Sequence, residues 1–320
     1  MNKIERVEAV LQGKRPDKIP AGFWYHYDSS LDPAQMAQEH VKTFRETGVD
    51  VYKLMQDYYQ IIDVDVKTPD DWKRVKFPGC SSPVYQNLLE VVKRILDATG
   101  HDAMIFQTMF GPLKTAVQNY GYDLVMAHAK EAPGALADAV LRIAEAQEEW
   151  AAGFIQAGVD GIFYSGQFSE PGRFTREEFE KLAMAGDLMV LKAAEENGAK
   201  NILHICGEPD YAYRSQPEWY VSYPFAIVNW SVKDTGLSLK DGRALFGGKP
   251  VLGGMNNRGN ILSGSGESIQ KEVKEVLASV DTLHGYMLGA DCTIQGETIS
   301  NEKIRIAVEA AHSYPMNETK

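Results

Sequence analysis

The stretch Ala-Gly-Val-Asp-Gly-Ile-Phe-Tyr at residues 157–164 decides the fold. A helical pattern over 135–157 stops at Gly158, because glycine readily takes the left-handed conformation that ends a helix. The apolar strand 159–164 begins at once. Thr-Gly-Val-Asp at 47–50 repeats this order of helix end, glycine turn and strand start. A helix that runs directly into a strand indicates repeated βα units, and we find no wider sequence repeat.

Outward from these two strands, short apolar runs alternate with helix-period segments along the whole chain. Thr175-Arg-Glu-Glu178 has the form of a capping box at a helix start, and Asn197-Gly198 marks a helix stop. The expected strands are 19–24, 49–55, 103–107, 159–164, 201–204, 225–229, 250–252 and 285–288. The expected helices between them are 33–47, 84–98, 135–157, 175–197, 238–245, 268–280 and 301–313. Eight strands that alternate with helices predict an α/β protein with a closed parallel (β/α)8 (TIM) barrel.

The domain organisation follows from the length and from the lack of linkers. A (β/α)8 barrel needs about 250 residues and often carries insertions. No Pro- or Ser-rich linker divides the chain, so we expect a single domain over residues 1–320. Residues 56–83, which are rich in Asp, Pro and Gly, form an insertion after the second strand. This insertion is expected to be either a lid over the barrel mouth or a plain surface excursion.

The bulk composition excludes several classes of function. The net charge of −11 argues against binding to nucleic acid or to anionic membranes, since both need clustered Lys and Arg. Residues 1–8 form a charged amphipathic pattern without the apolar core of a signal peptide, and no apolar stretch is long enough to span a membrane. Three cysteines do not make a disulfide framework. The expected compartment is therefore the reducing cytoplasm, where cysteines serve as metal ligands, nucleophiles or buried apolar residues.

Two of the cysteines fall where a barrel carries its chemistry, just past the carboxyl ends of the strands. His204-Ile-Cys206 closes the fifth strand, and alternation along a strand places residues i and i+2 on the same face. Cys292 follows the eighth strand at the same end of the barrel. One nitrogen and two thiolates match a catalytic zinc site with an open fourth position. The alternative is a satisfied core histidine beside two buried free thiols.

Four segments resemble the uroporphyrinogen decarboxylase superfamily. They are ERVEAVLQGKRPDKIP at 5–20, LHICG at 203–207, KPVLGG at 249–254 and SNEKI at 300–304, and the resemblance covers essentially the whole chain. The His-x-Cys…Cys set more narrowly resembles the methylcobamide methyltransferases of that superfamily, including methylcobamide:coenzyme M methyltransferases. The resemblance implies a (β/α)8 barrel with Zn²⁺ held by His204, Cys206 and Cys292.

The activity that this resemblance implies is methyl transfer. The methyl group would move between a corrinoid (methylcobamide), carried by a partner protein, and a small-molecule donor or acceptor. The sequence does not choose the direction of transfer. The resemblance also allows a homodimer, although no exposed apolar stripe marks an interface.

The decarboxylase branch of the superfamily matches less well. Its members carry an Arg-rich segment after the first strand that binds substrate carboxylates, and an essential Asp after the second. Here the first position reads FWYHYDSS at 23–30, and no arginine occurs between Arg15 and Arg45. A polycarboxylate needs cationic partners, because unpaired carboxylates are costly to bury. Decarboxylation without a cofactor is therefore the second hypothesis, and a non-catalytic barrel that binds a small molecule is the third.

Further candidates come from the other strand ends. The family often places a carboxylate metal contact after the sixth strand, where this chain has Asn229, so Asp291 is a candidate substitute. His26, Lys53 and Tyr164 are the candidate catalytic residues, and each has an equally plain structural interpretation as a buried histidine, an ordinary salt bridge or strand-end packing. The candidate substrate contacts are Trp24, Tyr27, Gln107, Asn229 and Asn256.

Overall fold

The computed structural model describes residues 1–296 and 298–316. Its strands form one parallel eight-stranded sheet in the order β1-β8-β7-β6-β5-β4-β3-β2, which confirms the predicted (β/α)8 barrel. The strands are β1 Ala21–Gly22, β2 Val51–Leu54, β3 Met104–Phe110, β4 Gly161–Gly166, β5 Ile202–Ile205, β6 Ile227–Trp230, β7 Val251–Met255 and β8 Tyr286–Ala290. Each lies within or beside a predicted strand, and β1 is much shorter than expected.

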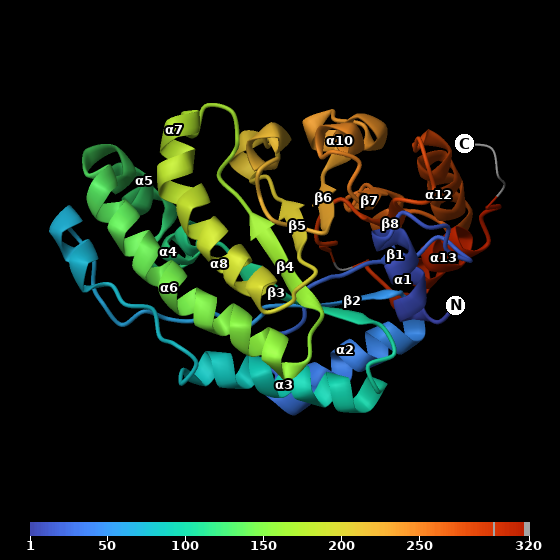
Figure 1. Cartoon of the computed structure of the whole chain (residues 1–320), viewed down its shortest axis with the longest axis horizontal. Coiled ribbons are helices and arrows are strands. Elements are labelled where there is room, and N and C mark those ends of the chain that lie inside the picture. The colour runs from blue at the N-terminus through green and yellow to red at the C-terminus, as the bar shows by residue number, and fades with distance from the viewer. Residues whose placement is uncertain (297, 317–320) are drawn as a thin grey trace.

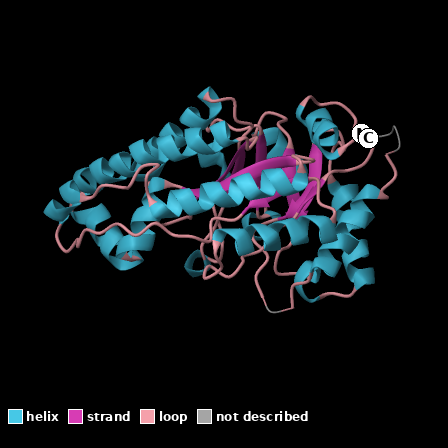
Figure 2. Ribbon diagram, turned by 90° about the horizontal axis from the view of Figure 1, so that it is seen from below, coloured by secondary structure: helices cyan, strands magenta, loops and turns pink. Residues whose placement is uncertain are grey.

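Helices surround the strands on the outside of the barrel, as Figures 1 and 2 show. The first seven are α1 Lys3–Leu11, α2 Pro33–Thr47, α3 Pro83–Thr99, α4 Pro112–Tyr120, α5 Tyr122–Glu131, α6 Pro133–Ala157 and α7 Arg176–Phe179. The others are α8 Ala185–Glu196, α9 Val232–Thr235, α10 Leu239–Leu245, α11 Asn260–Ser263, α12 Gly266–Ser279 and α13 Asn301–His312. Short 3₁₀ turns occur at Pro69–Arg74, Pro209–Tyr211 and Pro217–Tyr220, and a π-helical turn at Glu180–Met184 joins α7 to α8.

The helix ends have the chemistry that the sequence predicted. Gly48 after α2 and Gly158 after α6 have φ angles of 71° and 112°, in the left-handed region that a side chain would disfavour. Thr175 and Glu178 form the capping box that starts α7. The single helix expected over 175–197 is interrupted by the π-helical turn, which the hydrophobic pattern did not reveal.

An aspartate that begins a strand fixes that strand to its neighbour in two places. The Asp160 backbone N–H donates to the Ile105 carbonyl at 2.8 Å, and its carboxylate accepts the Ile105 N–H at 2.8 Å. Asp50 does the same with Ala21, at 2.7 and 2.9 Å. Asp50 thereby joins β1 to β2, the two strands at the ends of the hydrogen-bonded order. The echoed Gly-Val-Asp phrase therefore sets strand register, and at Asp50 it closes the barrel.

The barrel interior is a separate apolar cluster from the layer between strands and helices. Alternate residues of the strands point inward, and α1 covers the amino end of the barrel with Val7 and Val10. The inward residues are Trp24, Val51, Met55, Met104, Phe106, Phe163, Ile202, Ile227, Leu252 and Met287. Because this plug fills the lower barrel, any cavity must lie above it, at the carboxyl ends of the strands.

The chain departs from the simple βα alternation in two places. The insertion after β2 carries buried Trp72, whose indole N–H donates to His128 of α5 at 2.9 Å, while Arg142 of α6 donates to the Trp72 carbonyl at 2.6 Å. After β3 the chain forms α4 and α5, two short helices that are not among the predicted elements. In Figure 1 these helices lie with the insertion at the left of the barrel.

The lid role of 56–83 and the single domain over 1–320 stay predictions. The contacts of Trp72 tie the later part of the insertion to α5 and α6, whereas Gln56 and Tyr59 line the cavity at the barrel mouth.

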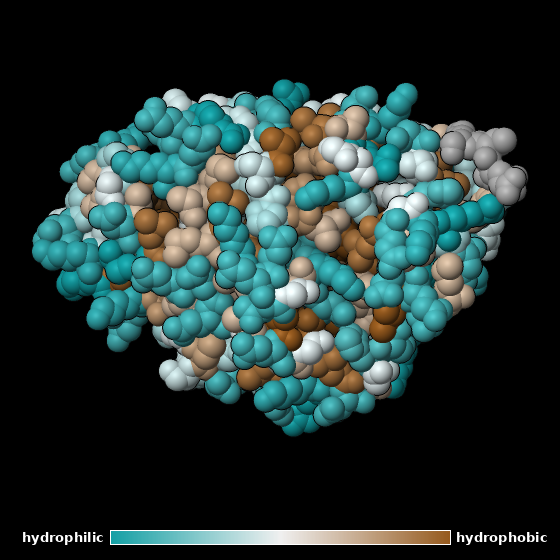
Figure 3. Space-filling model, in the orientation of Figure 1, coloured by the Kyte–Doolittle hydropathy of each residue, from teal (hydrophilic) through white to brown (hydrophobic). Residues whose placement is uncertain are grey.

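No helix in the described ranges is both long enough and apolar enough to cross a bilayer. The face shown in Figure 3 is mostly hydrophilic, with its apolar side chains in scattered patches.

Candidate metal centre

Three side chains with metal-binding atoms meet at the carboxyl end of the barrel. His204 lies on β5, Cys206 follows β5, and Cys292 follows β8. Their ligand atoms all lie within 4.8 Å of one another, and within the described residues this is the group of His, Cys, Asp and Glu side chains that could hold a metal ion. The structure therefore brings together all three residues that the sequence singled out as metal ligands.

Two of the three spacings between these atoms match a tetrahedral zinc site, and the third lies within 4.8 Å. The two cysteine sulfurs are 4.0 Å apart, and the Cys292 sulfur is 3.4 Å from His204 Nε2. Ordinary bonds of about 2.3 Å to sulfur and about 2.05 Å to nitrogen put two ligand atoms of a tetrahedron about 3.8 Å (S···S) and about 3.5 Å (S···N) apart. The residues therefore fit Zn²⁺ in both chemistry and spacing.

The hydrogen bond between the two cysteine side chains shifts their pKa values in opposite directions. The hydrogen bond that Cys292 accepts from Cys206 holds the pKa of Cys292 well below its usual value. The same hydrogen bond raises the pKa of Cys206 well above its usual value. A thiolate is the form of cysteine that binds a metal, and the lowered pKa of Cys292 favours that form.

Asn229 of β6 holds His204 from the side opposite the cysteines. Its amide nitrogen donates to the carbonyls of Leu252 and Ala290 at 2.6 and 3.0 Å. Its amide oxygen is 2.5 Å from His204 Nδ1. Asn229 is completely buried. Asn229 is a predicted substrate contact, whereas its side chain lies against His204 Nδ1 and does not line the cavity.

Asp291, the candidate substitute ligand, lies outside the three-ligand group. Its carboxylate accepts the Gly254 N–H at 3.1 Å and lies 3.4 Å from the Ser231 hydroxyl. Burial raises the pKa of Asp291 to about 7. These contacts direct the carboxylate to the segments that follow β6 and β7.

A cavity of about 420 Å³ opens beside the three ligands, and charged side chains line it. His26 is paired through Nδ1 with the buried Asp57 carboxylate at 2.6 Å, and Lys114 of α4 is paired with Glu208 at 2.8 Å. Lys53 is different: its Nζ lies 4.1 Å from the centre of the Phe163 ring, and in the described part of the chain it has no hydrogen-bond or ion-pair partner. Burial lowers the pKa of Lys53 to about 7.

The other predicted residues lie away from this cavity. Gln107 points outward from β3, since its neighbours Phe106 and Thr108 face the interior and the cavity. The Tyr164 hydroxyl donates to Asp187 of α8 at 2.6 Å, on the outer face of β4.

Trp24 lies inside the barrel, beneath Lys53, whose Nζ is 4.8 Å from its ring. The ring of Tyr27 packs on His40 with centres 4.2 Å apart. Asn256 caps its own loop by accepting the Arg258 N–H at 3.1 Å. The structure thus brings His26 and Lys53 to the metal ligands and leaves these three aside.

Several cavity residues were missed because they come from helix α4 and from long loops. Phe110 and Lys114 line the cavity from the end of β3 and from α4, and Gln118 follows one helical turn later. The signal was present in the sequence: Pro112 occupies the first position of α4, where proline favours a helix start.

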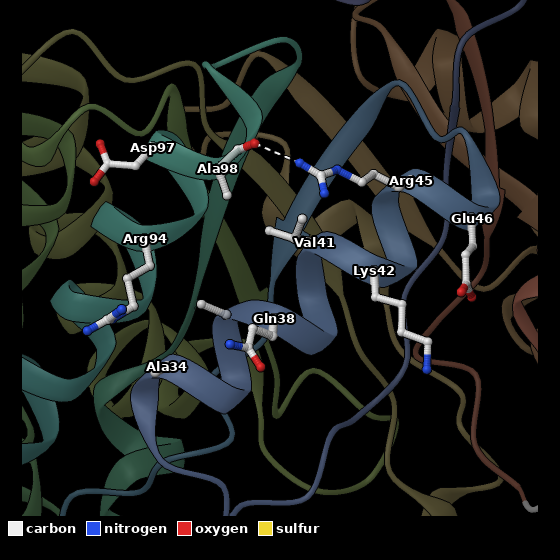
Figure 4. Close-up of a pocket in the computed structure, with 10 residues that line it drawn as sticks. Ala34, Gln38, Val41, Lys42, Arg45, Glu46, Arg94, Asp97 and Ala98 are labelled. Carbon is white, nitrogen blue, oxygen red and sulfur yellow. Dashed lines mark hydrogen bonds between the residues drawn. The ribbon is translucent and has the colours of Figure 1, made fainter.

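A second hollow, of about 700 Å³, lies on the outer surface between α2 and α3. Figure 4 shows its small apolar residues, such as Ala34 and Val41, between charged side chains, with Arg45 donating to the Ala98 carbonyl at 2.9 Å. It has neither the cysteines nor the histidine of the barrel mouth, and we assign the site to the mouth.

The fold and the site define a class: a (β/α)8 barrel with a His/Cys/Cys metal-binding set at the carboxyl ends of its strands. The sequence profile of the family described as Uroporphyrinogen decarboxylase (URO-D) matches residues 48–314. The chain belongs to this family. No curated protein sequence matches the chain.

Solved structures share the fold at low sequence identity. A methyltransferase from Methanosarcina mazei aligns with a TM-score of 0.77 and 20% identity, over 97% of this chain and 98% of that chain. A B12-independent methionine synthase from Shewanella sp. W3-18-1, in complex with selenomethionine, aligns with a TM-score of 0.58 and 15% identity, over 92% of this chain and 94% of that chain. A putative vitamin-B12 independent methionine synthase from Listeria monocytogenes aligns with a TM-score of 0.55 and 13% identity, over 87% and 86%. These likenesses establish the shared barrel.

Proposed function

We propose that this protein is a zinc-dependent methyltransferase that moves a methyl group between a corrinoid held by a partner protein and a small molecule. The observation that carries the proposal is the spacing of His204 Nε2, Cys206 Sγ and Cys292 Sγ, which suits one tetrahedral ion with a fourth position open. The methyltransferase from Methanosarcina mazei, which shares the fold, supports it. When bound, zinc lowers the pKa of a thiol or polarises the heteroatom of a methyl donor.

His26 is proposed to accept or donate the proton of the reaction. Asp57 holds His26 through Nδ1 at 2.6 Å, and Asp57 is itself fixed by the Tyr27 N–H at 3.0 Å. With Nδ1 occupied, Nε2 is the ring nitrogen left to exchange a proton with substrate in the cavity that His26 lines. A thiol acceptor must lose a proton and an alkoxide leaving group must gain one, so this pair serves either direction of transfer.

Lys53 is proposed to contact an anionic group of the substrate. It is an amine in the cavity wall without an ion-pair partner within the described residues, whereas His26 and Lys114 are paired with Asp57 and Glu208, and a bound anion would favour its protonated form. A positive charge on the cavity wall also disfavours a quaternary-amine methyl donor.

The decarboxylase hypothesis has less support. The described residues that line the cavity include no arginine, and the cavity carboxylate Glu208 is paired with Lys114. A porphyrinogen with many carboxylates would need several guanidinium partners to replace water.

Elemental analysis of purified protein tests the metal. We expect about one zinc per chain in the natural protein. Cys206→Ser and Cys292→Ser should lose it, whereas Cys80→Ser should retain it, because the Cys80 sulfur lies at the Glu149 carbonyl, away from the site. Folded protein that binds no zinc after incubation with the ion would contradict the proposal.

The activity is tested separately with zinc-loaded protein. Demethylation of methylcobalamin by a thiol, followed by the change in the corrinoid absorption spectrum, is the expected result, and it should be lost in Cys206→Ser. Methylation of cob(I)alamin by a methyl donor would indicate the opposite direction of the same reaction. Conversion of uroporphyrinogen III without metal would support decarboxylation instead.

A further inference from the structure

Asn229 lies on β6, and its hydrogen bonds identify which amide atom faces which partner. Two backbone carbonyls, of Leu252 and Ala290, lie 2.6 and 3.0 Å from one end of the side chain. Carbonyl oxygens only accept hydrogen bonds, so that end must be the NH₂ group. The amide oxygen therefore faces His204 Nδ1, at 2.5 Å.

This orientation determines the proton on the histidine. An amide oxygen can only accept, so His204 Nδ1 must carry the hydrogen. In a neutral imidazole the other nitrogen, Nε2, then has a free lone pair. Nε2 is the atom that lies 3.4 Å from the Cys292 sulfur, in the ligand group.

We infer that Asn229 is the positioning residue of the metal centre: it holds His204 in the Nδ1–H tautomer, with Nε2 ready to bind the ion. The inference rests on the proposed zinc site. It also excludes Asn229 as a ligand of the ion, because its amide oxygen already accepts a hydrogen bond from His204 Nδ1, on the side of the imidazole ring away from Nε2. The fourth position is then left to substrate.

The surroundings of Asn229 support a site built for an amide. Ala290 closes β8 two residues before Cys292, so the amide ties the histidine to the strand that carries a cysteine ligand. A Cβ added at Gly253 would lie 3.0 Å from the Asn229 nitrogen, so a glycine there leaves room for the side chain. An aspartate in the same place would set a negative charge against two carbonyl oxygens, which explains why this chain uses an amide.

The first test needs no variant. In metal-free protein with ¹⁵N-labelled histidine, NMR at neutral pH should show the His204 proton on Nδ1. A His204 Nδ1 without a proton would overturn the inference, whether or not the protein binds zinc. Failure to bind zinc with the Nδ1 proton present would instead reject the proposed function alone.

The second test compares variants by zinc affinity, measured by competition with a chelator. Loss of a side chain that orients a metal-bound histidine typically weakens metal binding about 10- to 100-fold, and Asn229→Ala should fall in this range. Asn229→Asp keeps an acceptor for Nδ1–H, so its His204 should stay in the Nδ1–H tautomer while the fold loses stability.

The matched control is Asn201→Ala. Asn201 is also a buried amide, accepting the Ile162 N–H of β4 at 3.1 Å and donating to the Leu191 carbonyl of α8 at 3.2 Å, but no hydrogen bond joins its side chain to His204. We expect this variant to be destabilised with zinc affinity within about twofold of the natural protein. An Asn229→Ala variant that binds zinc as tightly as Asn201→Ala would overturn the inference.

Discussion

Tyr164 and Asp187 form a buried polar contact on the outside of the barrel. Asp187 accepts hydroxyl hydrogen bonds from Tyr164 at 2.6 Å and from Tyr223 at 2.8 Å. Burial raises the pKa of Asp187 to about 7. The contact links β4 to α8, and because Tyr164 does not line the cavity we interpret it as a structural tyrosine.

Removal of the Tyr164 hydroxyl is therefore expected to affect stability and to spare zinc binding. In Tyr164→Phe one oxygen of the buried Asp187 carboxyl group loses its donor, which costs about 1–3 kcal/mol in the free energy of unfolding. Urea denaturation measures that loss, and elemental analysis should still find the metal. A variant with full stability and a lost activity would restore Tyr164 to the catalytic residues.

Asp187 also predicts a pH dependence of stability. Its pKa in the folded state is about 7, above the ordinary 3.8 of the unfolded chain. Between these values the folded protein binds a proton that the unfolded chain has released, so the stabilising contribution is complete below about pH 4 and is lost as pH rises to about 7.

Asp187→Asn cannot take up that proton. The difference in unfolding free energy between the natural protein and Asp187→Asn should shrink as pH rises from about 4 to about 7, by at most roughly 4 kcal/mol. Urea titrations at several pH values measure it. A difference that stays constant over this range would contradict the assigned pKa.

At the scale of elements, the glycines of β7 set how closely the strands and the side chains between them approach. Gly253 lies against the Asn229 amide, and a Cβ there would meet its nitrogen at 3.0 Å. Asn229 cannot easily move away, because three hydrogen bonds hold it among β5, β7 and β8. The strand and the metal centre are thus coupled through packing.

Gly253→Ala should consequently lower both the stability of the fold and the affinity for zinc. Overpacking in a filled interior costs about 1–3 kcal/mol, and displacement of Asn229 should weaken zinc binding. Gly134→Ala is the control: it lies in α6 with nothing within 4 Å of the added Cβ, so stability should stay equal or rise by about 0.5–1 kcal/mol. Equal zinc affinity in the two variants would argue against the coupling.

At the scale of the whole molecule, one aspartate joins the first and last strands of the hydrogen-bonded order. The Asp50 carboxylate is fully buried and meets three groups: the Ala21 N–H at 2.9 Å, Arg6 of α1 at 2.5 Å and His312 of α13 at 2.8 Å. These partners bring both ends of the chain to the barrel seam. Helices α1 and α13 lie at the same side of the barrel in Figure 1.

Asp50→Ala is therefore expected to cost more stability than Asp160→Ala. The first leaves the buried Arg6 without this partner, a loss of about 3–5 kcal/mol. The second removes a carboxylate that is 19% exposed and paired with a half-exposed histidine, a loss of about 1–2 kcal/mol.

Denaturation by urea ranks the two aspartate variants. Hydrogen exchange should show faster exchange of the Ala21 amide in Asp50→Ala, because that amide loses its acceptor. Equal destabilisation of both variants would contradict the expectation that the contacts of Asp50 at the barrel seam contribute more stability than those of Asp160.

The sequence by itself determined the barrel, because its evidence is local. Period-two and period-3.6 patterns, the glycine stops and the capping box each involve residues a few positions apart, and eight such units lead to one architecture. The ligand set was also readable, since His204 and Cys206 share a strand face and Cys292 ends another strand at the same mouth.

Only the tertiary structure decided what surrounds that set. The partners of His26 and Lys114 lie 31 and 94 residues away from them, those of Asn229 lie at least 23 residues away, and no local pattern pairs residues at such separations. The inward or outward direction of Gln107 and Tyr164 depends on the exact phase of a strand, and a shift of one residue reverses it. Local periodicity in the sequence therefore predicts the barrel, whereas contacts between distant segments determine which polar partners surround the metal ligands.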